Sequence, residues 1–317
     1  MTCIDPKNLG KVVVIYGGIS REREVSLMSG SAVVKALEEA GVDVGTFDPK
    51  TDALEVLQNK EYSRAFCMLH GRGGEDGIIQ GVLEYLQLPY TGCGIQASSI
   101  AIDKNATKVV WQAHGIPVPR GMVLRSQEDC KEAISSLGRN LIIKPSKEGS
   151  SIGLYRLENT DDVSLLDTYK KAQERNMDVL CEELVAGREL TVALLDRHDG
   201  QGLKALPIVE IRAPEGKYDY DHKYFSDETQ YLCPAPIDAD ITIKIQETCE
   251  KAAKVLGVEG WGRIDVILRD DGSFVLLEVN TAPGMTPHSL VPLAARTVGI
   301  NFTELVLTVA QGASLKA

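Results

Sequence analysis

Two carboxylates and an amide near the C-terminal end of the chain are of the types that bind a hard cation. Asp265 lies on one short apolar segment, and Glu278 and Asn280 lie on the next. Carboxylate and amide oxygens are ligands that Mg²⁺ accepts in proteins, where water and substrate phosphates complete its coordination. We therefore predict a magnesium site formed by these three side chains. The alternative is a solvated face with a diffuse charge network, in which Arg263 offsets part of the negative charge.

A β-hairpin is the element that would bring these side chains together. Asp271-Gly272 between two apolar, alternating runs predicts a two-residue turn with Asp270 opposite Ser273. In that register the two carboxylates face each other and Arg263 faces Asn280, and all four share one face because strand side chains alternate. Opposed carboxylates destabilise a sheet, so a cation must offset their charge. A turn of three or four residues would shift this register.

A lysine followed by a glycine- and serine-rich segment has the composition of a phosphate site. Lys144 ends a predicted strand, and residues 147–153 follow it. Backbone N–H groups and a lysine ammonium suit phosphate oxygens. The segment does not match the P-loop pattern, which argues against a Walker-type NTPase.

Composition and charge exclude several classes of protein. The chain has 317 residues, 44% of them hydrophobic and 25% charged, which is typical of globular proteins and enough for two or three domains. Its formal charge of -11 disfavours nucleic-acid binding. The start lacks a signal-peptide pattern and no apolar run is long enough for a bilayer, so we expect a cytoplasmic protein without membrane contact. The seven cysteines are scattered without Cys-x-x-Cys spacing and are expected to be reduced.

The first third of the chain repeats a strand, a glycine-rich turn and an amphipathic helix. Strands are expected at residues 11–16, 42–47 and 64–70, and this alternation predicts a parallel sheet. A dinucleotide-binding domain begins similarly, but Gly17-Gly18 is not part of a G-x-G-x-x-G pattern and Glu22 lies where pyrophosphate would approach. A NAD-dependent oxidoreductase is therefore disfavoured.

The remainder predicts a small α+β domain and a mixed C-terminal region. We expect helices at residues 104–114, 126–137 and 239–256, strands at 141–144, 179–182 and 191–195, and helices after the hairpin. Ser126 and Asp129 predict a capping box at the start of the second helix, and Gly257 is expected to end the third. Residues 212–233 are polar, contain several tyrosines and show no clear period. Such a long loop is either an active-site lid or a surface excursion.

Five segments that occur together and in order resemble the D-alanine–D-alanine ligase family of the ATP-grasp superfamily. They are residues 17–26, 69–77, 143–153, 260–265 and 278–292. The resemblance implies an α/β and α+β fold with a three-domain ATP-grasp architecture and a Rossmann-like N-terminal parallel sheet. The implied domains are 1–103, 104–193 with the glycine-rich loop, and 194–317 with the lid loop and the metal hairpin.

The resemblance also implies a nucleotide site between the central and C-terminal domains. ATP phosphates would meet Lys104, Lys144, Lys223 and the loop that contains Ser150 and Ser151. Adenine and ribose would lie against Glu182, Glu183, Leu184, Val185 and Glu189. Two Mg²⁺ ions, for which Mn²⁺ could substitute, would bind Asp265, Glu278 and Asn280.

The implied reaction joins two D-alanine molecules for peptidoglycan precursor synthesis. The first D-alanine carboxylate attacks the γ-phosphate of ATP, and the amine of the second attacks the resulting acyl phosphate, releasing ADP and phosphate. The implied substrate and catalytic residues are Glu22 on the first ammonium, His70 near the second substrate, Arg263 and Gly284 on the oxyanion, Ser289 and Leu290 on the second carboxylate, and Ser150 and Tyr224 linked to Glu22 over the closed site.

Some alternatives remain open. Coupling of D-alanine to D-lactate or D-serine is one, and a non-catalytic nucleotide-binding protein is another. Ala282 and Pro287 replace serines that are common in the family, and Phe225 replaces an aliphatic residue, although none of these is a proposed ligand. We also expect a homodimer.

Overall fold

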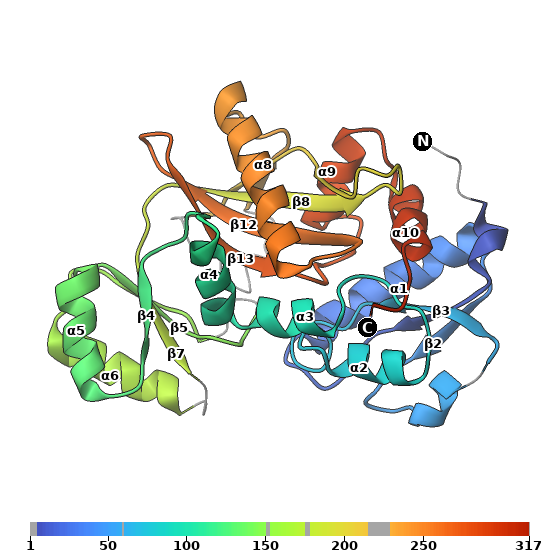
Figure 1. Ribbon diagram of the computed structural model, residues 1–317, viewed down its shortest axis with the longest axis horizontal. Coiled ribbons are helices and arrows are strands. Elements are labelled where there is room, and N and C mark those ends of the chain that lie inside the picture. Colours follow the sequence, from blue (N-terminus) through green and yellow to red (C-terminus); the bar gives the residue numbers. More distant parts are fainter. Residues whose placement is uncertain (1–4, 59, 150–152, 175–177, 215–228, 317) are drawn as a thin grey trace.

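The N-terminal region contains a parallel sheet, as predicted. The structure is a computed structural model that describes residues 5–58, 60–149, 153–174, 178–214 and 229–316 (Figure 1). The sheet has the order β2 (Val44–Phe47), β1 (Lys11–Ile15) and β3 (Tyr62–Cys67). Strand β3 ends at Cys67, before the predicted limit at residue 70, so His70 lies on the segment that follows the C-terminal end of the strand. The helical segments of this region are η1 (Pro6–Leu9), α1 (Arg23–Glu39), η2 (Leu54–Gln58), α2 (Ile78–Tyr85) and α3 (Ile95–Ile102).

The central region is an antiparallel sheet covered by two helices. Its strand order is β4 (Gly121–Leu124), β7 (Val179–Glu183), β5 (Leu141–Pro145) and β6 (Tyr155–Leu157). Helices α5 (Gln127–Leu137) and α6 (Asp162–Gln173) pack on it around a separate core and form the green lobe of Figure 1. Helix α5 begins with the capping box predicted from Ser126 and Asp129.

The C-terminal region contains a larger antiparallel sheet. The strand order is β11 (Gln230–Leu232), β10 (Val209–Arg212), β8 (Arg188–Asp196), β12 (Trp261–Leu268) and β13 (Phe274–Asn280), and β9 (Leu203–Ala205) pairs with β8. Strand β8 spans the expected domain limit at residue 193. The helices are α4 (Lys104–Ala113), α8 (Ala239–Leu256), which ends at Gly257 as predicted, α9 (Leu290–Thr297) and α10 (Phe302–Gln311).

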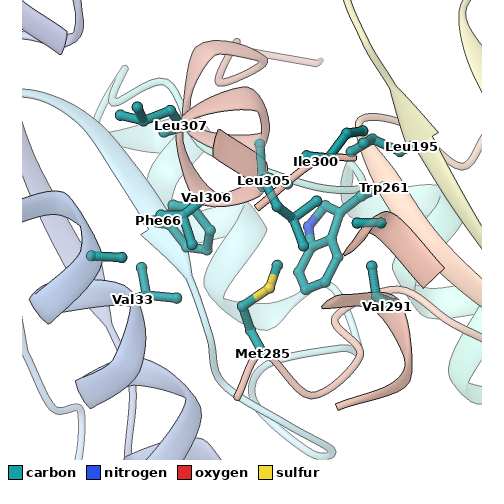
Figure 2. Close-up of a cluster of buried hydrophobic side chains, with 14 of the residues drawn as sticks. Val33, Phe66, Leu195, Trp261, Met285, Val291, Ile300, Leu305, Val306 and Leu307 are labelled. Carbon is teal, nitrogen blue, oxygen red and sulfur yellow. The ribbon is translucent and has the colours of Figure 1, made fainter. Parts of the chain in front are cut away.

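One hydrophobic core joins the two ends of the chain. Figure 2 shows Val33 of α1 and Phe66 of β3 in one hydrophobic cluster. The same cluster contains Trp261 of β12, Leu305 of α10 and Met285, which lies between β13 and α9. Alternate residues of β1 face this core and a second core under α2, so both faces of the N-terminal sheet are buried. Burial on both faces is characteristic of parallel sheets. The N-terminal sheet is thereby fixed against the helices that follow the hairpin.

The polar stretch predicted at residues 212–233 is partly described. Its ends form paired strands, with Arg212 opposite Gln230, and residues 215–228 lie outside the described residues. Among the described helices, none alone has the length and apolarity to cross a membrane, although the bent pair α9 and α10 passes by length and composition together.

Candidate functional site

The hairpin aligns its polar residues as predicted, but with a different turn. Arg263 faces Asn280, and Asp265 faces Glu278. The turn, however, has three residues rather than two, because Arg269 N donates to Ser273 O at 2.8 Å. The prediction of a two-residue turn was therefore wrong.

The physical reason for the longer turn is the position of its glycine. Gly272 N donates to Arg269 O at 3.0 Å, and Gly272 has a φ of 81°, in the left-handed region. A tight turn followed by a left-handed glycine is the common way to close a three-residue hairpin. Asp271 fixes it further by accepting the Ser273 N–H at 2.9 Å and hydroxyl at 2.6 Å.

A β-bulge restores the register of the polar face. From the turn inward, the pairing runs from Leu268 opposite Phe274 to Val266 opposite Leu276, and then skips one residue of β13. The skipped residue is Leu277, so that Glu278 still lies opposite Asp265. The longer turn and the bulge are two one-residue shifts that cancel.

Asp265 is buried in a dense set of donors. Arg263 Nε and Nη2 donate to its two carboxylate oxygens, each at 2.9 Å, and Thr191 Oγ1 donates at 2.6 Å. Asn280 Nδ2 lies 3.4 Å from Asp265 Oδ2. Asp265 is only 8% exposed, which argues against the solvated-face interpretation of the hairpin. Arg263, which was expected to offset part of the negative charge, is the cation that contacts Asp265.

The second carboxylate has a different cation partner. Lys104, the first residue of α4, places its Nζ 3.2 Å from Glu278 Oε2. The same ammonium donates to the backbone oxygen of Glu148 at 2.7 Å. Lys104 therefore connects the hairpin to the start of the glycine-rich loop.

The donor set of the hairpin fits Mg²⁺ only if the amide takes part. Among the described residues, no group of three His, Cys, Asp or Glu side chains is arranged to hold a metal ion. Two carboxylates and the Asn280 amide oxygen on one face are hard donors, and Mg²⁺ commonly takes few protein ligands and completes its shell with water and phosphate. Rotating the Asn280 amide would present its oxygen.

A buried ion cluster links α4 to the central sheet. Glu182 of β7 is 2% exposed, and its two oxygens contact different lysines. Lys144 Nζ of β5 lies 2.8 Å from Oε2, and Lys108 Nζ of α4 contacts Oε1. Lys108 was not predicted from the sequence. Its position one turn after Lys104 was the available signal, because residues four apart share a helix face.

The other residues expected around the base and ribose lie at the end of β7 and the start of β8. Glu183 pairs with Arg120 at 2.7 Å, and Leu184 N donates to Asn140 O at 2.8 Å. Leu184 and Val185 are half-buried, and Glu189 lies in β8 opposite residues of β10 and β12. The Glu182 and Glu183 carboxylates are thus engaged by cations of the chain.

Glu22 lies where two glycine segments approach the head of α1. It is the N-cap residue of that helix and is 9% exposed. A Cβ atom at Gly149 would stand 2.8 Å from Glu22 Oε2, and one at Gly71 would also meet this carboxylate. A side chain at either position would displace the Glu22 carboxylate, so the loop that precedes Ser150 is packed against Glu22.

His70 lies beside Glu22 and is 5% exposed. Within the described residues, its Nε2 atom has no hydrogen-bond partner. Burial lowers the pKa of His70, against the opposing influence of the Glu22 charge. A neutral imidazole with a buried, available nitrogen suits a residue that contacts a substrate amine.

Glu75 interacts electrostatically with Glu22, as His70 does, and was missed by the sequence analysis. It accepts the N–H of Gly71 at 2.8 Å and the N–H of Ala282 at 3.1 Å. Burial, followed by the Glu22 charge, raises the pKa of Glu75 to about 7. Because Ala282 uses its backbone here, the loss of the family's serine side chain leaves this contact intact.

A hydrogen bond to α1 also holds the segment that follows the hairpin. Met285 N donates to Ser29 Oγ at 3.1 Å, which places the neighbouring Gly284 beside α1. Ser289 is the N-cap residue of α9, and its Oγ accepts the Thr286 N–H at 3.0 Å. Leu290 is the first helical residue, and the N-terminus of a helix favours an anion. The Ser289 N–H itself donates to Thr286 O at 2.9 Å.

Four predicted site residues fall on parts of the chain for which the structure gives no description. They are Ser150, Ser151, Lys223 and Tyr224, and the departure at Phe225 lies there too. The other predicted residues lie at the hairpin face, near the head of α1, at the start of α4, at the ends of β5 and β7, at the start of β8, and on the segment from Gly284 to the start of α9.

Known proteins resemble this chain over nearly its whole length. A family model described as D-ala D-ala ligase N-terminus matches residues 45–93, and one described as D-ala D-ala ligase C-terminus matches residues 110–311. A D-alanine–D-alanine ligase of Cupriavidus pinatubonensis is 48% identical over 312 residues, covering 98% of this chain and 94% of that protein. The corresponding ligase of Pseudomonas entomophila is 49% identical over 306 residues, covering 96% and 94%.

Solved structures agree with these sequence matches. A D-alanine–D-alanine ligase from Bacillus anthracis in complex with ATP has a TM-score of 0.81 at 28% identity, covering 96% of this chain and 97% of that chain. A D-Ala:D-Ser ligase from Enterococcus faecalis has a TM-score of 0.80 at 30% identity, covering 96% and 98%. The chain belongs to the D-alanine–D-alanine ligase family and has its three-domain ATP-grasp architecture.

Proposed function

We propose that this protein is an ATP-dependent ligase that condenses two D-alanine molecules into D-alanyl-D-alanine, releasing ADP and phosphate, for peptidoglycan precursor synthesis. One observation carries the proposal. Lys104 contacts both the Glu148 carbonyl at the glycine-rich loop and the Glu278 carboxylate of the hairpin. A single ammonium thus joins the elements suited to phosphate and to metal, and phosphoryl transfer from ATP relies on positioned cations of these kinds.

We propose that Asp265, Glu278 and Asn280 hold Mg²⁺, as two ions, with Mn²⁺ as a possible substitute. The bound metal would neutralise charge on the terminal phosphates during transfer. Lys104 and Lys144, together with Ser150, Ser151 and Lys223, would bind phosphate oxygens. The base and ribose would be surrounded by the end of β7, with Glu182, Glu183, Leu184 and Val185, and by Glu189. Glu182 would also hold the two lysines that it contacts.

The substrates would lie between the head of α1 and the start of α9. The Glu22 carboxylate would pair with the ammonium of the first D-alanine, whose carboxylate attacks the γ-phosphate. The Nε2 atom of His70, which has no hydrogen-bond partner among the described residues, would face the second amine. The N–H groups at Ser289 and Leu290 would hold the second carboxylate, and Arg263 with the Gly284 N–H would stabilise the oxyanion. Ser150 and Tyr224 would close the site over Glu22.

The expected assembly and location belong to the same proposal. We propose a cytoplasmic homodimer that uses ATP and D-alanine. The domains expected from the sequence are 1–103, 104–193 and 194–317. Because the whole of β8 pairs in the C-terminal sheet, we propose that the third domain begins at Arg188 rather than at residue 194.

Substrate-dependent release of phosphate and ADP tests the activity. We expect release with D-alanine and Mg²⁺, formation of the dipeptide by mass spectrometry, and little release with L-alanine. The structural similarity to a D-Ala:D-Ser ligase makes D-serine a second candidate for the second substrate. Higher activity of D-alanine with D-serine or D-lactate than with itself would overturn the substrate assignment. ATP binding without turnover on any D-amino acid would indicate a non-catalytic nucleotide-binding protein.

A further inference from the structure

Lys108 is a buried lysine for which the proposed reaction has no role so far. It lies on α4, is 5% exposed, and its Nζ contacts Glu182 Oε1. Burying an ammonium is costly, so a lysine in such a place is retained with partners that offset the cost. Its partner Glu182 is itself 2% exposed.

Each carboxylate oxygen of Glu182 contacts a different lysine. Oε2 is 2.8 Å from Lys144, which ends β5 at the glycine-rich loop, whereas Oε1 is held by Lys108 from the opposite element. A carboxylate with one free oxygen can rotate about its terminal torsion, which is broad in glutamate. Contact with Lys108 removes that freedom and fixes the direction from which Oε2 meets Lys144.

Helix α4 therefore carries two lysines that each contact one carboxylate. Lys104 contacts Glu278 at the metal face, and Lys108, one turn later, contacts Glu182 at the central sheet. Burial and the nearby ammoniums of Lys144 and Lys104 lower the pKa of Lys108. Its N–H donation to Glu182 persists in either protonation state, because a neutral amine also carries N–H donors.

We propose that Lys108 is a positioning residue for ATP, which holds the Glu182 carboxylate so that Lys144 directs its ammonium toward the phosphates. The inference rests on the proposed function, in which Lys144 contacts ATP. Lys108 touches no substrate and acts through Glu182. Without it, Glu182 can turn toward Lys144 with both oxygens and draw the ammonium away from the nucleotide.

Steady-state kinetics and ATP binding on Lys108→Met test the proposal. Losing one charge-assisted hydrogen bond at this place should raise the KM and Kd for ATP about tenfold, with the KM for D-alanine unchanged. Lys108→Arg keeps N–H donors and should recover part of the ATP affinity. Lys316→Met is the matched control, because its side chain is 3% exposed but its ammonium contacts Tyr90 O, at 3.0 Å, and Ser314.

A double-mutant cycle separates positioning from a general structural effect. In the Glu182→Gln background, Lys108→Met should change ATP affinity less than about twofold, because the residue acts only through the carboxylate. An unchanged Kd for ATP in Lys108→Met, or a full additional loss in the Glu182→Gln background, would overturn the proposal. If Lys108→Met does not fold, Lys108→Gln carries the same test.

The same measurements distinguish this inference from the proposed function. If the wild-type protein binds ATP but does not ligate D-alanine, the proposed function fails, and the binding cycle still decides the role of Lys108. If the wild type ligates D-alanine and Lys108→Met binds ATP normally, only the inference fails.

Discussion

Arg263 donates two hydrogen bonds of 2.9 Å to the carboxylate of Asp265, which lies two residues further along the same face of β12. The guanidinium proposed for the oxyanion is thus fixed by a carboxylate proposed as a metal ligand. A bidentate arginine–carboxylate pair has a defined geometry, so the position of one group sets that of the other. Metal binding and oxyanion stabilisation would therefore depend on the same few atoms.

Replacing Glu278 by glutamine should abolish most of the turnover without unfolding the protein. The substitution removes a charged metal ligand but little volume, and removal of such electrostatic stabilisation typically costs about 100- to 1000-fold or more in kcat. D-alanine-dependent phosphate release at saturating Mg²⁺ measures it, with circular dichroism as the check on folding. Asp270→Asn is the control, since Asp270 is an exposed carboxylate at the hairpin turn. Turnover near the wild-type rate would remove Glu278 from the metal site.

Glu22→Gln should raise the KM for the first D-alanine by about tenfold or more, because it removes the charge that pairs with the substrate ammonium. The KM for ATP should change little. Initial rates over a range of D-alanine concentrations give the answer. Glu24→Gln serves as the comparison, because Glu24 is exposed on the same helix. Equal KM values for D-alanine in the two variants would show that Glu22 does not bind the substrate.

Glu75 should make the folded protein less stable as the pH rises. Its pKa is about 7 in the folded protein and 4.5 when unperturbed, so the folded state binds more protons between these values. The free energy of unfolding then decreases as pH increases through this window. Accordingly, the Tm of Glu75→Gln relative to wild type should increase from about pH 5 to about pH 8.

Differential scanning fluorimetry of the metal-free proteins measures this difference. Glu55→Gln, in the short helix η2, should give a Tm difference that does not follow the same trend, since Glu55 is exposed. A Tm difference for Glu75→Gln that is flat or declines with pH would contradict a raised pKa at this carboxyl.

Leu305→Ala should destabilise the protein by about 2–5 kcal/mol, as expected for a leucine removed from a packed core. Leu305 is fully buried where α10 meets the N-terminal sheet. Urea unfolding followed by circular dichroism gives the midpoint. Leu315→Ala removes the same atoms from a side chain that is 37% exposed, and should cost less than about 1 kcal/mol. Similar costs for the two variants would mean that the shared core adds little stability.

Local sequence signals predicted elements better than contacts between distant elements. The helix that ends at Gly257 and the capping box at Ser126 depend on neighbouring residues, and both were confirmed. Helix α3 was missed because its residues show little amphipathic alternation and it starts at a glycine without a side-chain cap. The core between α1, α10 and β12 joins residues more than 200 positions apart, which periodicity cannot reveal.

In the candidate site, too, features set by local sequence were predicted and features set by distant contacts were missed. Strand alternation correctly predicted that Asp265 and Glu278 share one face. Their direct pairing was derived from a two-residue turn, and it holds only because the bulge cancels the shift caused by the longer turn. Lys108 and Glu75 were missed because their significance arises from burial and from partners on other elements. Lys108 meets a residue 74 positions away, and Glu75 meets one 207 positions away.

The bulge at Leu277 isolates the tip of the hairpin from the carboxylates at its base. Because it absorbs a one-residue mismatch inside β13, the length of the turn does not by itself fix which residues meet at the site. Changes in length at the tip can be taken up in the strand, while the face that carries Asp265 and Glu278 is held by β8, which pairs with the other edge of β12. Residues 270–272 are therefore a suitable place to insert a fluorescent or affinity label into the working enzyme.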